Sequence, residues 1–166
     1  MGVEIERKFL VRAEYKHLAV SSTRIRQAYI ASGGGRTVRV RIRDERAYLT
    51  IKGPGNHAGT ARYEFEIEIP LNDAIDLMRI AEPGVIDKRR YLVPYKGHTF
   101  EVDEFYGENE GLTMAEVELS QEGEQVELPD FIGEEVTADA RYYNSHMRVY
   151  PYRLWRGDAG VAGGIG

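Results

Sequence analysis

The chain has 166 residues, of which 42% are hydrophobic and 30% charged, and its formal net charge is −5. This composition fits a soluble domain with its own core, and the acidic balance gives no general attraction for nucleic acid or an anionic membrane. The absence of cysteine excludes disulfides and cysteine-ligated metal centres. No apolar run is long enough to span a membrane, and the charges from Glu4 onward do not fit a signal peptide. We therefore expect a cytoplasmic protein.

Alternation of apolar and polar residues predicts β-strands along most of the chain. In chain order, the eight predicted strands lie near residues 3–9, 25–29, 38–43, 48–52, 62–69, 85–94, 98–105 and 113–119. A run of glycines at 33–35 predicts the turn after the second strand, and Lys96-Gly97 predicts a tight hairpin turn.

Two helices are predicted. One begins at Pro70 and has an apolar stripe formed by Ile75, Leu77 and Met78, and the other covers about residues 138–149. No linker or repeat divides the chain, so we expect one domain over residues 1–156 and a flexible tail rich in Gly and Ala over residues 157–166. A monomer and a homodimer are both compatible with the sequence.

Many short strands joined by hairpin turns favour a mainly β fold with an antiparallel barrel or sandwich. The helix between the fifth and sixth strands leaves an α+β sandwich open as an alternative. A barrel becomes the preferred architecture when the charges on the strands are considered.

The polar positions of these strands are almost all charged, and the charges are sorted by strand. They are Glu4, Glu6 and Lys8; Arg39, Arg41 and Arg43; Glu64, Glu66 and Glu68; Lys88 and Arg90; Glu101 and Asp103; and Glu116 and Glu118. On one strand alone, such a run would indicate a solvated outer face. Like charges two residues apart on one face lie roughly 7 Å from each other and repel.

The repulsion is tolerable where opposite charges, a metal or a highly charged ligand lie between the runs. A barrel provides this arrangement if its polar face surrounds a wet lumen, while helices and loops cover part of its apolar outside. Carboxylates are suited to hard cations, and Arg and Lys are suited to phosphate oxygens. Together these groups match the needs of a triphosphate–metal complex.

The opening Glu4-x-Glu6-x-Lys8 resembles the signature of the triphosphate tunnel metalloenzymes, also called CYTH-domain proteins. The resemblance extends to about Asn144 through six further segments in the same order. They are Arg39-Val40-Arg41, Leu49-Thr50-Ile51-Lys52-Gly53, Arg62-Tyr63-Glu64-Phe65-Glu66, Lys88-Arg89-Arg90-Tyr91, Val102-Asp103 and Ala115-Glu116-Val117-Glu118-Leu119. The stretch from Gly133 to Thr137, with Arg141, Tyr142 and Asn144, also resembles the family's C-terminal pattern. The resemblance implies an eight-stranded antiparallel β-barrel that forms a charged tunnel, with a few covering helices.

The resemblance also implies roles for individual residues. The implied metal ligands are Glu4, Glu6, Asp103, Glu116 and Glu118. The implied phosphate-binding residues are Lys8, Arg39, Arg41, Lys52, Lys88 and Arg90. Glu64 and Glu66 would lie inside the tunnel and, with Glu4, Glu6 and Lys8, form the catalytic set. Arg43 lies near its strand end, where a rim position and phosphate binding both stay open, whereas Arg7 and Arg89 should point outward.

The implied activity is Mg²⁺- or Mn²⁺-dependent hydrolysis of a small-molecule triphosphate, with inorganic triphosphate as the first candidate. Class IV adenylate cyclase and thiamine or nucleoside triphosphatase activities occur on the same fold and stay open as alternatives. An alternative of another class is a non-catalytic module that binds polyphosphate or a nucleotide. No nucleic-acid or membrane partner is expected.

Overall fold

The computed structural model describes residues 2–56, 58 and 60–157. Its strands are β1 (Gly2–Val11), β2 (Ser21–Gly33), β3 (Arg36–Arg43), β4 (Arg46–Gly55), β5 (Ala61–Ile69), β6 (Ile86–Tyr95), β7 (His98–Phe105), β8 (Thr113–Glu118) and β9 (Ile132–Glu135). Its α-helices include α1 (Leu71–Arg79) and α2 (Asn144–Met147), and residues 152–157 are also helical. Short 3-10 turns occupy Lys16–Leu18, Gly107–Asn109 and Ala140–Tyr142. Apart from Gly157, the predicted flexible tail lies outside the described residues.

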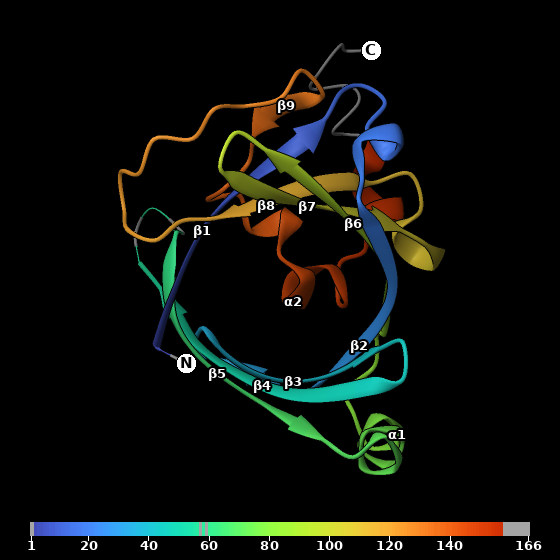
Figure 1. Cartoon of the computed structure of the whole chain (residues 1–166). Coiled ribbons are helices and arrows are strands. Elements are labelled where there is room, and N and C mark those ends of the chain that lie inside the picture. The colour runs from blue at the N-terminus through green and yellow to red at the C-terminus, as the bar shows by residue number, and fades with distance from the viewer. Residues whose placement is uncertain (1, 57, 59, 158–166) are drawn as a thin grey trace.

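Eight strands form a closed antiparallel barrel, which confirms the predicted fold (Figure 1). The strand order is β5-β4-β3-β2-β6-β7-β8-β1, and pairing between β5 and β1 closes the ring. Three of its hairpins turn at residues with positive φ, among them Asp44 at 55° and Lys96 at 45°. Such φ values give tight turns whose twist matches that of the flanking strands. The alternation in each strand therefore places one set of side chains inside and the other outside.

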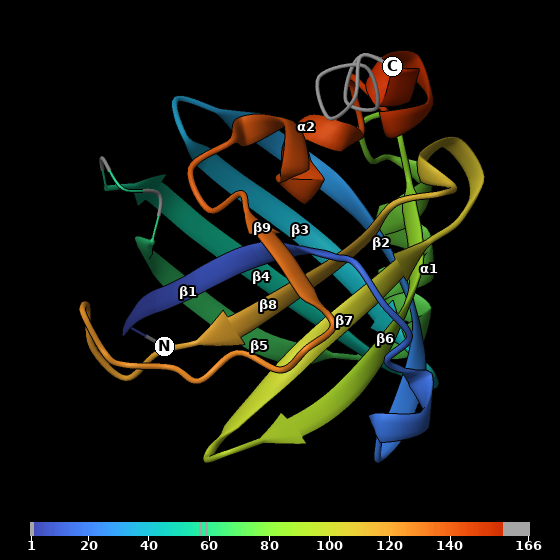
Figure 2. The ribbon, with the colours of Figure 1, turned by 90° about the horizontal axis from the view of Figure 1, so that it is seen from above.

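The strand β9 was not predicted, and it extends the barrel at one end. The first half of β1 pairs with β5, whereas its second half pairs with β9 along the same edge, in the register Phe9 to Glu135 and Val11 to Ile132. Along this edge, β1 therefore pairs first with β5 and then with β9. This arrangement brings the chain after β9 to one end of the barrel (Figure 2).

The apolar side chains on the outer face of the barrel are covered in two places. One cluster, which includes Phe9, Phe100 and Val117, packs against Phe131 and Tyr15 from the connecting segments. In another cluster, α1 covers Val40 and Ile42 of β3. The helix begins where predicted, and Leu77 and Met78 pack as expected, but Ala74 is the buried residue. Ile75 is 39% exposed, so its predicted place in the apolar stripe is wrong.

A third apolar cluster fills one end of the barrel interior. Ile86, Phe105 and Met114 share the alternation of the inward-facing charged residues of their strands, and they pack against Met147 and Trp155. The inner wall thus changes from apolar at this end to charged further along each strand. No helix in the described part of the chain is both long and apolar enough to cross a membrane.

The segment that fills this end is not the continuous helix predicted over residues 138–149. Tyr143 has an extended backbone, with φ −79° and ψ 133°, and it separates the 3-10 turn from α2. Asp139 caps the 3-10 turn by accepting a hydrogen bond from the backbone N–H of Arg141, and the Tyr143 hydroxyl donates to the carbonyl of Thr137. These local bonds hold the chain in a bend, so that α2 enters the ring of strands (Figure 1).

Candidate active site

A cavity of about 630 Å³ lies within the barrel. Every charged residue expected to act on the substrate contributes to its lining except Asp103. In total, the lining contains nine Lys or Arg residues and seven Glu residues, so the positive and negative charges nearly balance. A bound polyanion would reverse this balance, because it adds negative charge to a wall that has few positive charges in excess.

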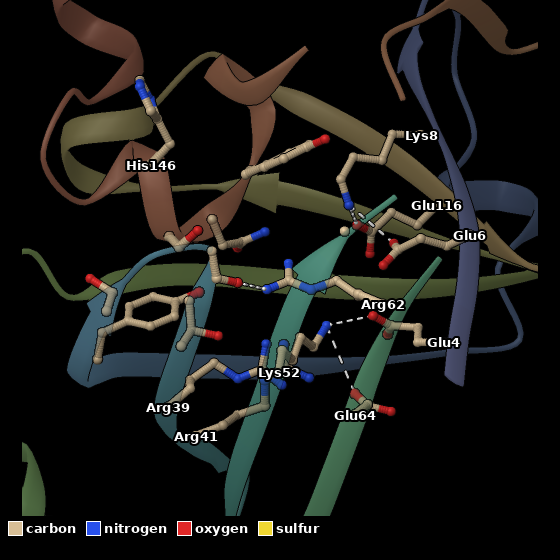
Figure 3. A pocket seen from close by; sticks show the side chains of 18 of the residues that line it. Glu4, Glu6, Lys8, Arg39, Arg41, Lys52, Arg62, Glu64, Glu116 and His146 are labelled. Carbon is tan, nitrogen blue, oxygen red and sulfur yellow. Dashed lines mark hydrogen bonds and ion pairs between the residues drawn. The ribbon is translucent and has the colours of Figure 1, made fainter. Parts of the chain in front are cut away.

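The carboxylates of β1 and β8 lie together on one side of the cavity (Figure 3). The antiparallel register places Glu6 opposite Glu118 and Lys8 opposite Glu116. Directly opposed residues on one face of an antiparallel pair have Cβ atoms about 5 Å apart. Two strands distant in sequence therefore bring the acidic residues into one group.

Two lysines pair with these carboxylates. Lys8 Nζ donates to Glu6 Oε2 at 3.1 Å and also contacts Glu116 Oε2. Lys52 Nζ donates to Glu4 Oε1 at 2.8 Å and lies 3.8 Å from Glu64 Oε2 (Figure 3). The described residues contain no group of three or more His, Asp or Glu side chains already arranged to hold a metal ion. The two ammonium groups thus offset part of the acidic charge.

The carboxylates differ in pKa because their surroundings differ. Burial, together with the neighbouring charge of Glu116, raises the pKa of Glu6 to about 8. Burial also opposes the charge on Glu4, but the charge and hydrogen bond of Lys52 bring its pKa below the usual value. Burial and the nearby charge of Glu4 raise the pKa of Glu118. The positive charges of the two lysines therefore do not fully compensate the negative charge of the carboxylates in this part of the cavity.

A basic part of the cavity wall is formed by Arg39 and Arg41 of β3 with Lys88 and Arg90 of β6, and it adjoins the carboxylates, since Arg90 lies 3.5 Å from Glu116 Oε1. Arg39 is 6% exposed and Lys88 is fully buried. Burial lowers the pKa of Lys88 to about 7 despite the attraction of Asp103. Burial also lowers the pKa of Arg41, and the neighbouring charge of Arg39 has the same effect. The protein therefore holds several cations close together and largely out of water.

Asp103 lies behind this basic wall and does not line the cavity. Its carboxylate accepts two hydrogen bonds from Arg90, both 2.8 Å long, and its Oδ2 lies 2.7 Å from Lys88 Nζ. These contacts occupy both carboxylate oxygens. Asp103 therefore contacts two basic side chains, and one of them, Arg90, also lies 3.5 Å from Glu116 Oε1.

The remaining predicted residues lie where their alternation suggests. Glu64 and Glu66 line the cavity, and Glu66 accepts a hydrogen bond of 2.7 Å from Thr50, which in turn accepts one from Arg39. Arg43 is exposed at the rim, where it donates to the hydroxyl of Tyr48. Outside the cavity, Arg7 forms two hydrogen bonds with Glu135, and Arg89 donates to Ser22.

Several residues of the lining were not among the predicted site residues. Arg36 and Arg62 lie at the cavity, and Arg62 donates to the carbonyls of Gly53 and Gly35. Arg62 lies two residues before Glu64 and so on the same face of the strand, and this spacing could have predicted its position at the cavity. Tyr143, Asn144 and His146 come from the C-terminal segment, whose entry into the barrel was not predicted.

The fold and the site define the chain as a closed antiparallel barrel with a charged lumen, which is lined by carboxylates and by cationic side chains. The family model of the CYTH domain matches residues 2–147. The chain therefore belongs to the CYTH domain family.

The chain is similar to proteins from two bacteria and to a protein of known crystal structure. An inorganic triphosphatase of Acetivibrio thermocellus is 46% identical over 158 residues, which cover 94% of this chain and 99% of that protein. An inorganic triphosphatase of Nitrosomonas europaea is 35% identical over 151 residues, covering 88% of this chain and 97% of that protein. A crystal structure of an inorganic triphosphatase superposes with a TM-score of 0.64 at 29% identity, over 87% of this chain and 97% of that chain.

Proposed function

We propose that this protein is a metal-dependent phosphohydrolase that converts inorganic triphosphate into diphosphate and phosphate. The observation that carries the proposal is one cavity that is lined both by a group of carboxylates and by a wall of Arg and Lys. Simple capture of an anion needs the basic wall but not the carboxylates. The similarity to two inorganic triphosphatases over nearly the whole chain supports the same activity.

The donor chemistry of the acidic side fits Mg²⁺ or Mn²⁺, since hard divalent cations take oxygen ligands. The residues proposed to hold the ion are Glu4, Glu6, Glu116 and Glu118. Crowding of Glu6 against Glu116 supports this assignment, because a cation between them would relieve their repulsion. A bound cation supplies charge compensation for phosphate oxygens and activation of water.

Lys8 and Lys52 have a double role in this proposal. Without substrate, each pairs with a carboxylate of the acidic group. Both ammonium groups line the cavity and can turn to phosphate oxygens once the carboxylates have another partner. The protein would thus keep its internal charges paired both with and without substrate.

The basic wall orients the phosphate chain and stabilises charge during the reaction. Arg39 and Arg41 present planar guanidinium groups that can bind two phosphate oxygens each. With Lys88 and Arg90, they would stabilise charge on the transferring phosphoryl group and on the leaving diphosphate. Glu66 orients Arg39 through Thr50.

Phosphate release from tripolyphosphate, ATP and thiamine triphosphate, each with Mg²⁺ and with Mn²⁺, tests the proposed function. We expect the highest kcat/KM with tripolyphosphate and no release in EDTA. Cyclic AMP formed from ATP would replace the proposal with a cyclase. Binding of tripolyphosphate without any product would make the protein a binding module.

Removal of single carboxylates tests the metal assignment. We expect Glu6→Gln and Glu118→Gln to lower kcat by about a hundredfold or more, because charge compensation by metal contributes several kcal/mol to the transition state. Glu68→Gln is the matched control, since Glu68 lies on β5 with the alternation of Glu64 but is exposed and outside the cavity lining. Full activity of either cavity variant at saturating Mg²⁺ would show that the assignment is wrong.

A further inference from the structure

Two side-chain amides join basic residues from different strands of the cavity wall. Gln27 of β2 is fully buried, and its Oε1 accepts a hydrogen bond of 2.8 Å from Arg41 Nε. Asn144 is the first residue of α2, and its Oδ1 accepts hydrogen bonds from Lys88 Nζ at 2.9 Å and from Gln27 Nε2 at 3.3 Å. A continuous chain of hydrogen bonds therefore runs from Arg41 through Gln27 and Asn144 to Lys88.

Both acceptors in this chain are neutral. A carboxylate is found beside the other cations of the wall, since Asp103 contacts both Arg90 and Lys88. Over the described residues, no carboxylate oxygen lies within ion-pair distance of Arg41, and Gln27 is its hydrogen-bond partner. An amide can fix the direction of a guanidinium or ammonium group without cancelling its charge. The charge of Arg41 is thus kept for a ligand in the cavity.

The hydrogen bonds to Gln27 and Asn144 leave particular N–H groups of Arg41 and Lys88 for the cavity. Because Nε of Arg41 is held by Gln27, its two terminal amino groups are left for the cavity that Arg41 lines. Lys88 donates to Asn144 and contacts Asp103, which leaves a third proton on an ammonium group that also lines the cavity. Hydrogen-bonded networks in a buried, low-dielectric setting hold their members rigidly.

We propose that Gln27 and Asn144 are positioning residues of the phosphate site, which hold Arg41 and Lys88 towards the phosphate chain without adding a negative charge beside them. This inference rests on the proposed function and adds two residues to it that the charged motifs do not include. It also gives the C-terminal segment a part in substrate binding, because Asn144 reaches the basic wall only when α2 lies inside the barrel.

Substitution of each amide by the corresponding acid separates orientation from charge. Gln27→Glu and Asn144→Asp keep the shape and an acceptor oxygen but place a negative charge beside Arg41 or Lys88. We expect the Kd for tripolyphosphate, measured by calorimetry in EDTA, and the KM with Mg²⁺ each to rise about tenfold, since an added charge beside a binding cation is an interaction of this size. Gln121→Glu, on an exposed loop outside the cavity, is the matched control and should leave both constants unchanged.

A second substitution removes orientation and keeps charge. Gln27→Met has a similar shape but no acceptor for Arg41, so we expect KM to rise and kcat to fall about tenfold. A role of Gln27 in stability alone would lower the melting temperature and leave the KM of the folded fraction unchanged. If the Gln27 variants do not fold, as judged by circular dichroism, Asn144→Asp decides, because Asn144 is only half-buried.

The outcomes separate this inference from the proposed function. If the wild-type protein releases no phosphate from tripolyphosphate, the proposed function fails, and the calorimetric Kd values still test the positioning role. Folded Gln27→Glu and Asn144→Asp variants with Kd and KM within about twofold of the wild-type values would overturn the inference.

Discussion

At the scale of single residues, the site combines side chains of the same type in different surroundings. Glu6 lies near Glu116 and has a raised pKa, whereas the carboxylate of Asp103 is held by Arg90 and Lys88 and has a pKa below its usual value despite burial. Carboxylates crowded by like charge favour a cation. A carboxylate enclosed by two cations is suited to holding them in place.

Replacement of Asp103 tests this distinction. Asp103→Asn removes the charge that compensates two buried cations, so we expect the free energy of unfolding to fall by about 3 kcal/mol or more. Glu101→Gln is the control on the same strand. Glu101 also contacts Arg90, at 3.3 Å, but its side chain is 42% exposed, so we expect a loss within about 1 kcal/mol. Urea unfolding measures both, and an Asp103→Asn variant of unchanged stability without Mg²⁺-dependent activity would favour direct metal binding instead.

At the scale of elements, the C-terminal segment completes the site because it is anchored inside and beside the barrel. Arg148 contacts Ser32 of β2 and lies 2.8 Å from Glu82 in the connection before β6. Gly84 in the same connection has a φ of 99° and lies against the backbone of Arg148, where an added Cβ would be 2.3 Å from its carbonyl oxygen. This close approach requires glycine for both conformational and steric reasons.

Gly84→Ala should therefore loosen the segment. Gly123→Ala is a matched control, because Gly123 also has a positive φ, 81°, but has no atom within 4 Å of an added Cβ. Both changes carry backbone strain of about 1 kcal/mol or more, and we expect Gly84→Ala to lower the free energy of unfolding by a further 1–3 kcal/mol or so through overpacking. We also expect faster proteolysis after α2 in this variant. Equal losses in the two variants would contradict a tight anchor at Gly84.

At the scale of the whole molecule, stability and activity depend on different parts of the barrel. Two apolar clusters cover the outside and one fills an end of the interior, and none includes the carboxylates proposed to bind metal. Lys8 and Lys52 pair with those carboxylates. We therefore expect that the fold does not depend on a bound metal or substrate.

Chelation should separate the two properties. In EDTA we expect phosphate release to stop while the melting temperature stays within a few degrees of its value with Mg²⁺. Addition of tripolyphosphate with Mg²⁺ at about 100 times Kd should stabilise the folded protein by about 2.7 kcal/mol through mass action. Differential scanning calorimetry measures both effects. Unfolding on addition of EDTA would show that the metal has a structural role.

Much of the architecture follows from the sequence because strand alternation is a local property. The charges on β1, β3, β5 and β8 share one face of each strand, and the structure places that face inside the barrel as predicted. Alternation could not show that Asp103, inward on its strand, would be enclosed by Arg90 and Lys88. Nor could it show the bend at Tyr143, which depends on hydrogen bonds formed by neighbouring side chains and backbone.

The sequence by itself determined the eight strands of the barrel and the sorting of charge among them, because each depends on residue type and spacing along the chain. Only the tertiary structure decided which opposite charges meet, as Lys52 meets Glu4 and Lys8 meets Glu6 and Glu116. It also decided that neutral Gln27 and Asn144 lie against Arg41 and Lys88. These contacts join residues as many as 108 positions apart, and barrel closure and the entry of α2 bring them together.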